Sequence, residues 1–142
     1  MTEIQVKQDI RKLSLDQIKT WMTEHGEKAF RAKQIYEWIW KKSAGSFGDM
    51  TNLSLSTRAL MDQFFVINAL TVDTKQQSND GTVKSAFRLF DGNIVEGVLI
   101  PATDRMTACV SSQVGCSLTC KFCATGYMDR KRNLEAGEMY DQ

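Results

Sequence analysis

Three cysteines lie close together in the sequence, and their spacing is the feature that most clearly indicates chemistry. Cys116, Cys120 and Cys123 follow a C-x3-C-x2-C pattern. Three thiolates on one short loop can hold a metal ion or a cluster. An ordinary four-iron electron carrier has four cysteine ligands, so three cysteines leave one iron open. An open iron can bind the amino and carboxylate groups of S-adenosylmethionine and pass it an electron to make a radical.

The cysteine spacing resembles the signature of the radical S-adenosylmethionine superfamily, and Phe122, directly before the last cysteine, belongs to that resemblance. A structural zinc site is the first alternative, but it takes four ligands, usually from two paired clusters. Here there is one C-x2-C pair, Cys109 lies in a predicted strand, and the single histidine, His25, is far away. A disulfide framework is disfavoured because nothing indicates secretion. We therefore expect an iron–sulfur cluster, ahead of zinc and of inert thiols.

The composition is that of an ordinary globular protein. The 142 residues suit one medium domain or two small ones, and the net charge of +1 does not indicate nucleic-acid binding. No apolar run reaches the roughly 20 residues of a membrane helix, and the N-terminus has no apolar signal region. We expect a cytoplasmic protein with no membrane attachment. Residues 133–142 resemble the start of a helix, which indicates a fragment of a longer protein.

The first half of the sequence predicts helices. Ser14 and Gln17 form a capping-box start, apolar residues then recur at helical spacing, and Gly26 closes the helix. Further helices are predicted over residues 30–42 and 53–65. We expect residues 1–68 to form a small helical domain, and the family resemblance described below implies that it is an accessory domain that binds RNA.

The second predicted helix has a basic and aromatic flank. Arg31, Lys33 and Lys41 lie close to Tyr36 and Trp40. One interpretation is that this flank touches RNA backbone or stacks a base. The other is that the aromatic residues belong to the core and the lysines form a solvated edge, which the sequence alone favours.

After the helices the apolar pattern changes to a period of two. Strands are predicted at 69–77, 82–90 and 94–100, with tight turns at 79–81 and 91–92, so residues 69–101 should form an antiparallel meander. Residues 105–111 form a further strand, and the cysteine loop starts where it ends, as in an α/β barrel. The expected fold class is α+β, with residues 102–142 as the first strand and cluster loop of a truncated radical S-adenosylmethionine (β/α) partial TIM barrel.

An acidic residue, Glu96, shares one face of the predicted strand 94–100 with the apolar residues Ile94, Val98 and Ile100. Desolvation on an apolar face raises the proton affinity of a carboxylate, which suits proton abstraction near neutral pH. The alternative is a salt bridge to Lys84 or Arg88 on a neighbouring strand, or an exposed sheet edge. The sequence does not choose between them.

Three segments together resemble one family closely: residues 96–101 (Glu-Gly-Val-Leu-Ile-Pro), 107–116 (Thr-Ala-Cys-Val-Ser-Ser-Gln-Val-Gly-Cys) and 120–126 (Cys-Lys-Phe-Cys-Ala-Thr-Gly). They resemble the bacterial dual-specificity methyltransferases that modify C2 of adenine in 23S ribosomal RNA and in transfer RNA. The antibiotic-resistance adenine-C8 methyltransferases are near relatives. Residues 127–129 depart from the family pattern. The family's basic stretch after the cluster, with its implied RNA contacts, corresponds to Arg130, Lys131 and Arg132.

The resemblance implies a 4Fe-4S cluster on the three clustered cysteines, S-adenosyl-L-methionine as cofactor, and an electron donor for the cluster. In the family, a methyl group first moves to a cysteine near the C-terminus. A carbon radical derived from it then adds to adenine and joins the RNA covalently to the protein. The resemblance assigns the removal of the ring proton to Glu96. It assigns to Cys109 the thiol attack that releases the product while a transient disulfide forms.

The methyl-carrying cysteine and the glycine-rich segments for S-adenosylmethionine are not among these 142 residues, so the chain alone should be inactive. Three other functions stay open: a C8-specific relative, another RNA-modifying radical enzyme such as a methylthiotransferase, and a zinc-stabilised RNA-binding module. Methylthiotransferases usually need a second cluster, and Cys109 is the one cysteine left for it. Metal content separates the zinc module from the enzymes.

Overall fold

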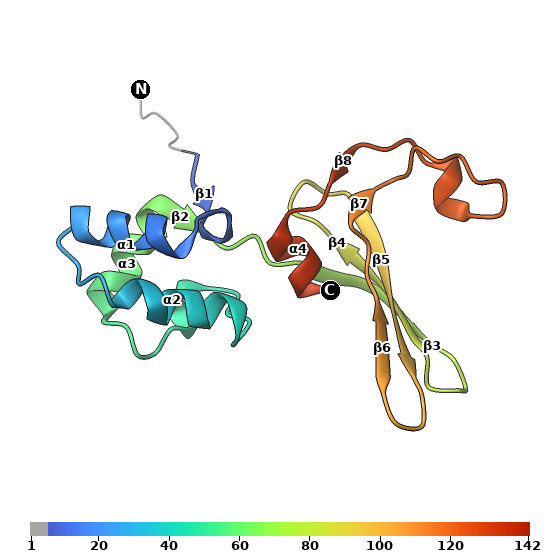
Figure 1. Ribbon diagram of the computed structural model, residues 1–142, viewed down its shortest axis with the longest axis horizontal. Helices are drawn as coiled ribbons and strands as arrows, with labels where there is room; N and C mark the ends of the chain where they lie inside the picture. The colour runs from blue at the N-terminus through green and yellow to red at the C-terminus, as the bar shows by residue number, and fades with distance from the viewer. Residues whose placement is uncertain (1–5) are drawn as a thin grey trace. The chain divides into compact units, whose positions relative to one another are not determined.

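The computed structural model describes residues 6–142 (Figure 1). The first five residues, which begin the predicted domain 1–68 and the N-terminal stretch that lacks a signal region, lie outside the described part. The chain forms two compact units that divide between Asn68 and Ala69. The finer division of the second unit at residue 101 stays a prediction. No helix within the described residues combines the length and the apolar character that crossing a bilayer requires.

The first unit is mainly helical, as its sequence predicts. Its elements are β1 (Gln8–Asp9), a 3-10 helix (Ile10–Lys12), α1 (Leu15–Glu24), α2 (Arg31–Trp40), a second 3-10 helix (Phe47–Asp49), α3 (Leu55–Phe64) and β2 (Phe65–Val66). The capping box at α1 is confirmed, because Ser14 Oγ accepts from the N–H of Gln17 at 3.2 Å and Gln17 Oε1 accepts from the N–H of Ser14 at 2.7 Å. Each terminal N–H that these side chains bind would otherwise lack a helical partner.

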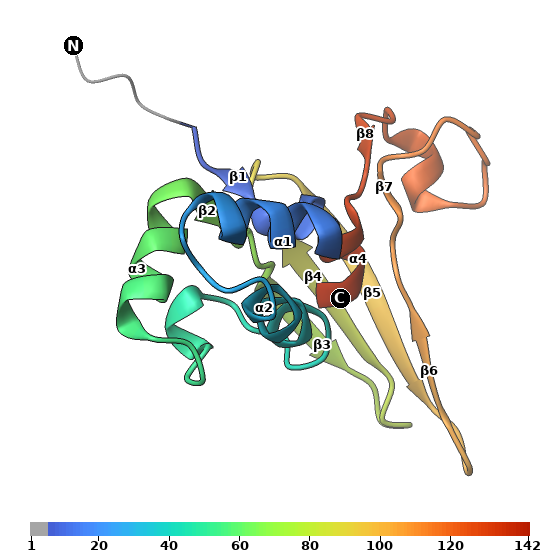
Figure 2. The ribbon, with the colours of Figure 1, turned by 60° about the vertical axis from the view of Figure 1, so that its left-hand side comes forward.

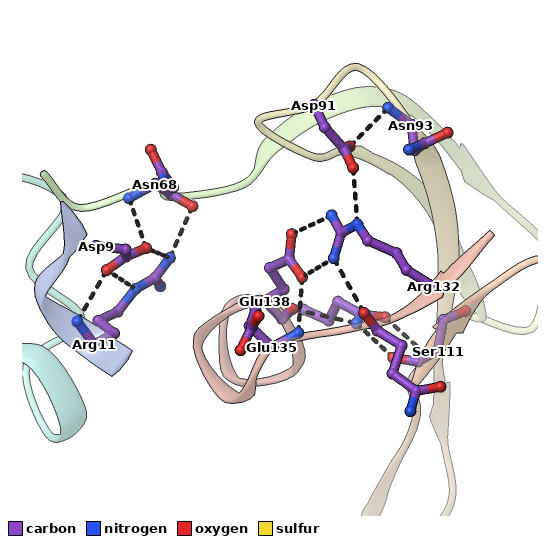
Figure 3. Close-up of polar contacts among 11 residues, drawn as sticks. Asp9, Arg11, Asn68, Asp91, Asn93, Ser111, Arg132, Glu135 and Glu138 are labelled. Atoms are coloured by element: carbon purple, nitrogen blue, oxygen red, sulfur yellow. Dashed lines mark hydrogen bonds and ion pairs between the residues drawn. The ribbon is translucent and has the colours of Figure 1, made fainter. Parts of the chain in front are cut away.

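The core of this unit is built from the apolar stripes of its helices, and two ion-paired residues close it at one end. The buried apolar residues are Ile10, Ile18, Met22, Ala32, Ile35, Ile39, Ala44, Phe47, Met50, Leu53, Met61 and Phe65. Arg11 Nη2 donates to Asp9 Oδ2 at 3.2 Å and to the carbonyl oxygen of Asn68 at 2.7 Å, and the N–H of Asn68 donates to Asp9 at 3.1 Å (Figure 3). This network joins β1 and the residue that follows it closely, Arg11, to Asn68, the last residue of the unit, next to the parallel pairing of β1 and β2.

The second unit contains the predicted meander, extended by one strand. Its sheet has the order β3 (Thr71–Gln77), β4 (Val83–Arg88), β5 (Ile94–Pro101) and β6 (Met106–Cys109), all antiparallel (Figure 2). The strand predicted at residues 105–111 corresponds to β6, and its place as the first strand of a barrel stays a prediction. The connection explains the antiparallel pairing of β5 and β6: Ala102 donates its N–H to the carbonyl of Arg105 at 2.8 Å. A turn this short joins antiparallel strands, whereas parallel strands need a crossover of a dozen or more residues.

One face of the sheet carries the second core. Phe87 and Val95 are directly opposite each other on β4 and β5 and are buried together with Leu89, Val114 and Leu134. The remaining elements follow the sheet in the order β7 (Gln113–Val114), a 3-10 helix (Ala124–Tyr127), β8 (Arg132–Asn133) and α4 (Ala136–Asp141).

An ion-pair network centred on Arg132 joins three of these elements (Figure 3). Arg132 Nε donates to Asp91 Oδ2 at 2.8 Å, in the turn after β4, and its two terminal nitrogens donate to the two carboxylate oxygens of Glu138 on α4, each at 2.7 Å. The Glu138 residue is only 2% exposed. The hydrogen bond from Arg132 lowers the pKa of Asp91 to about 2. Burial opposes ionisation of Glu138, but the hydrogen bonds from Arg132 and from the N–H of Glu135 outweigh it and lower its pKa.

Replacing Arg132 by methionine is expected to destabilise the second unit by about 3 kcal/mol, because the buried carboxylate of Glu138 loses its cation. The measurement is urea unfolding followed by the amide NMR signals of residues 69–142, which separates this unit from the first. Arg130→Met is the matched control, since the exposed Arg130 donates to Asn133 on the loop surface and should cost no more than about 0.5 kcal/mol. An equal decrease in the free energy of unfolding in the two variants would contradict a central role for Arg132.

The same network predicts that the second unit loses stability in acid. A carboxyl group whose pKa is lower in the folded chain stabilises the fold above its unfolded pKa, and that contribution disappears as the pH falls through the folded pKa. The ordinary values are 3.8 for Asp91 and 4.5 for Glu138. Stability should therefore decline from about pH 4.5 towards about pH 2, and less steeply in Arg132→Met. Urea midpoints measured across this range test it; parallel pH profiles for the two proteins would refute it.

Candidate functional site

The three clustered cysteines lie in a loop whose two ends are held together by a short ribbon. β7 and β8 pair antiparallel on either side of the loop. Next to that pairing, the N–H of Lys131 donates to the carbonyl of Val114 at 2.9 Å, and the N–H of Cys116 donates to the carbonyl of Met128 at 3.1 Å. The chain therefore enters and leaves the cysteine loop at adjacent points.

Two glycines let the loop close on itself. Gly115 has φ +71°, and a Cβ atom there would lie 2.0 Å from the carbonyl oxygen of Asp129. At Gly126 a Cβ atom would lie 2.5 Å from the carbonyl oxygen of Cys120. Both contacts are too short for any side chain, so only glycine permits these approaches. The motif therefore needs glycine at these two positions, in addition to its three cysteines, for the loop to close.

The three loop thiols are free and half-buried. Leu118 donates its N–H to Cys116 Sγ at 3.4 Å, and Cys120 Sγ lies 3.8 Å from the carbonyl oxygen of the same leucine. Within residues 6–142, no three histidine, cysteine or acidic side chains gather around a point that a single metal ion could occupy. In a 4Fe-4S cluster each thiolate binds its own iron, so three free thiols on one loop are the kind of donor set that such a cluster takes.

The carboxylate of Glu96 is not buried on an apolar face, which was one of the two environments that the sequence allowed. Its side chain is 57% exposed, and its Oε1 is 2.9 Å from Lys84 Nζ on β4. The physical reason is the alternation of β5, in which Val95 and Gly97 are buried while Glu96 lies on the opposite face. The salt bridge to Lys84, left open by the sequence, is the arrangement observed. The other candidate, Arg88, pairs with Asp73 instead.

Cys109 ends β6 as an exposed free thiol. It is directly opposite Val98, two residues along β5 from Glu96. Opposed residues of an antiparallel pair share a face, and so do residues two apart on one strand. The structure therefore brings Glu96 and Cys109 to the same face of the sheet. This follows from the short turn between β5 and β6, which sequence reasoning missed.

A cavity of about 210 Å³ lies between the strand of Glu96 and the cysteine loop. Its strand side is formed by Ile94, Val95 and Glu96, and its loop side includes Gly115 and Thr125. Cys109 borders a different cavity, of about 300 Å³. Across the first cavity, the candidate catalytic residue Glu96 thus faces residues next to the cysteines, Gly115 and Thr125.

The hydroxyl of Ser111 holds the backbone at Glu96. Ser111 Oγ donates to the carbonyl oxygen of Glu96 at 2.7 Å. The backbone N–H and C=O of Ser111 bind the side-chain amide of Gln142, at 2.8 Å each. The end of α4 thus fixes the segment that leads into the cysteine loop, and that segment fixes β5.

The predicted basic flank of α2 is only partly available. Arg31 is half-buried with its Nε 3.4 Å from Glu27, whereas Lys33 and Lys41 are exposed, the latter with Glu37 at 4.0 Å. Tyr36 and Trp40 are partly buried against the helical core, with ring centroids 6.2 Å apart. The aromatic residues thus belong to the core, as one interpretation held, and RNA contact by the basic residues stays a prediction.

The basic stretch after the cluster is largely tied into the second unit. Arg130 donates to Asn133 at 2.7 Å, and Lys131 Nζ donates to Asn93 at 2.8 Å. Arg132 forms the network with Asp91 and Glu138 described above. Sequence reasoning assigned these three residues to RNA and missed the structural role of Arg132, which depends on partners distant in sequence.

Known RNA methyltransferases match both units of the chain. Residues 8–67 match the family described as "Ribosomal RNA large subunit methyltransferase N-terminal domain". A Cytophaga hutchinsonii protein named "Probable dual-specificity RNA methyltransferase RlmN" is 64% identical over 141 residues, which are 99% of this chain and 38% of that protein. A protein of the same name from Exiguobacterium sibiricum is 41% identical over 136 residues, 96% of this chain and 38% of that protein.

A solved structure agrees with these relatives. The crystal structure of a radical SAM methyltransferase from Sphaerobacter thermophilus superimposes with a TM-score of 0.81 at 39% sequence identity, over 93% of this chain and 39% of that chain. The chain spans about 38% of the length of the curated relatives it matches. Because single relatives match nearly the whole chain, including both units and the cysteine loop, the chain belongs to the RlmN family of RNA methyltransferases.

Proposed function

We propose that a complete protein containing this chain methylates C2 of adenine in 23S ribosomal RNA and in transfer RNA. Family membership supports RNA as the substrate and methyl transfer as the reaction. The observation that carries the finer proposal is the cavity between Glu96 and the residues flanking the cysteines, Gly115 and Thr125. A reaction at a ring carbon needs a proton acceptor next to the base, and this cavity has a candidate, Glu96, on one side and residues next to the cysteine loop on the other.

Cys116, Cys120 and Cys123 are proposed to hold a 4Fe-4S cluster fed by an electron donor. With S-adenosylmethionine bound, the cluster would supply the radical that activates a methyl group on a cysteine elsewhere in the protein. The carbon radical derived from that methyl group can add to an electron-poor adenine carbon that polar methyl transfer does not reach. The chain's own part is to present the three thiols on a closed loop. Gly115 and Gly126 make that closure possible.

Glu96 and Cys109 are proposed to complete the reaction once RNA is joined to a methyl-carrying cysteine elsewhere in the protein. Glu96 would accept the proton that leaves the substituted ring carbon. The Cys109 thiolate would attack the sulfur of the adduct, so that an S–S bond forms as the S–CH2 bond breaks and the released carbon takes up a proton. Their position on one sheet face supports action on one substrate.

Basic residues of both units are proposed to contact RNA phosphates. Lys33 and Lys41 on α2 are exposed, and Arg130 is exposed on the loop that follows the cluster. Such contacts would add a salt-dependent contribution to the affinity, because each neutralised phosphate releases counterions. The near-zero net charge limits this contribution to local patches.

The cluster proposal predicts the metal content of the protein. After anaerobic reconstitution, the complete protein should contain about four irons and four sulfides, as a cubane cluster requires. Cys123→Ser should lose most of this iron, and Cys109→Ala, which removes the one cysteine of these 142 residues that lies outside the motif, should keep it. Iron, sulfide and zinc are measured together, and stoichiometric zinc without sulfide would contradict the proposal.

The assignment of Glu96 and Cys109 predicts what accumulates when either is replaced. Cys109→Ala should reduce turnover at least ~100-fold and trap enzyme covalently attached to RNA, because the resolving thiol is absent. Glu96→Gln should also stall release, since the ring proton stays in place. Denaturing gels with labelled RNA detect the adduct. Thr107→Ala, on the same strand as Cys109, is the control. Normal turnover without an adduct in Cys109→Ala would refute the assignment.

A further inference from the structure

We propose that Lys84 is a positioning residue for Glu96, whose carboxylate it holds over the sheet face that also carries Cys109. The inference deepens the proposed function and rests on it, because it takes Glu96 as the group that accepts the ring proton. The ion pair itself is observed: Lys84 Nζ lies 2.9 Å from Glu96 Oε1.

The register of the sheet explains why these two side chains meet. Lys84 on β4 is directly opposite Val98, and Ala86 is directly opposite Glu96. Lys84 and Glu96 are therefore diagonal neighbours on one face, a separation that long side chains can span. The short side chain of Ala86 leaves the space across which they reach. Cys109, opposite Val98 from the other side, completes the row.

Other charged groups nearby are already engaged. Arg88, the second cation of β4 on this face, pairs with Asp73 of β3. The residues that share the 210 Å³ cavity with Glu96 carry no charge; among them are Ser111, Gln113 and Thr125. Within the described residues, Lys84 is thus the cation that faces Glu96.

The ion pair between Lys84 and Glu96 restrains the Glu96 carboxylate, and it adds little to the stability of the fold. The side chains of Lys84 and Glu96 are 47% and 57% exposed, and exposed ion pairs add little to stability. A general base, however, must be held within hydrogen-bond reach of the proton it accepts. Ser111 fixes the backbone at Glu96 through a 2.7 Å hydrogen bond, and Lys84 fixes the end of the side chain. The Lys84→Met variant should consequently fold normally, so a change in its behaviour reports on the positioning of Glu96 and not on stability.

The first test uses this chain without any catalysis. NMR relaxation of the Glu96 side-chain methylenes reports how ordered the carboxylate arm is. In Lys84→Met the order parameter should fall, and Lys84→Arg should largely restore it. Lys75→Met is the matched control, because Lys75 is an exposed lysine on β3 opposite Ser85, on the other face of the sheet. An unchanged order parameter in Lys84→Met would overturn the proposal.

The second test uses a complete enzyme containing this chain. Lys84→Met should slow decay of the covalent RNA adduct at least ~10-fold and leave RNA affinity within about twofold of the parent, because the cation acts through Glu96 rather than on RNA. Lys84→Arg should recover most of the rate, and Lys75→Met should match the parent.

Two results of the second test would overturn the role of Lys84: weaker RNA binding with unchanged adduct decay, which is the signature of a phosphate contact, or no change in either quantity. Failure of the proposed function looks different. A parent enzyme that forms no adduct and methylates no adenine would refute that function, while the order parameters would still decide whether Lys84 positions Glu96.

Discussion

The second unit depends on one guanidinium group. Arg132 lies on the strand by which the chain leaves the cysteine loop, and it binds the turn after β4 through Asp91 and the last helix through Glu138. Glu138 is buried, so its negative charge is tolerable only with this partner. The β7–β8 ribbon has just two residues in each strand and would be weak alone. The cysteine loop is therefore held in place from the exit strand, by a residue that makes no contact with a thiol in the described structure.

The features that the sequence predicted well are those that depend on near neighbours. The capping box of Ser14 and Gln17 needs only residues three apart, and the period-two pattern of residues 69–101 depends on alternation within each strand. The features it missed need partners far away. Arg132 reaches Asp91 across 41 residues, and a basic triplet in a sequence gives no sign of this. The antiparallel direction of β6 is decided by the turn between Ala102 and Arg105, which the sequence analysis did not predict.

At the candidate site, the sequence likewise indicated which residues could take part in chemistry, but it did not indicate how each of them is surrounded. The spacing of Cys116, Cys120 and Cys123 indicated their chemistry, and the glycines of the same motif prove necessary for closing the loop. The apolar neighbours of Glu96 suggested burial, but alternate residues of one strand point to opposite faces, and only the face of Val95 is covered. A run of apolar residues in a strand therefore does not say which face carries the core. That information comes from the elements packed against the sheet, here β7 and α4 with Val114 and Leu134 nearby.

The position of β6 at the edge of the sheet has a consequence for how this 142-residue chain, taken alone, behaves in solution. Among the described strands, β6 pairs with β5 on one side only, and all four of its residues are exposed. An edge strand has unpaired backbone N–H and C=O groups, which can pair with a strand of another chain. The opposite border, β3, carries a lysine and an irregularity between Val72 and Thr74, both of which discourage such pairing. The sequence Met-Thr-Ala-Cys of β6 has no charge to discourage it. Self-association of this chain should therefore begin at the strand that carries Cys109, whose exposed thiol can join two copies through a disulfide under oxidising conditions.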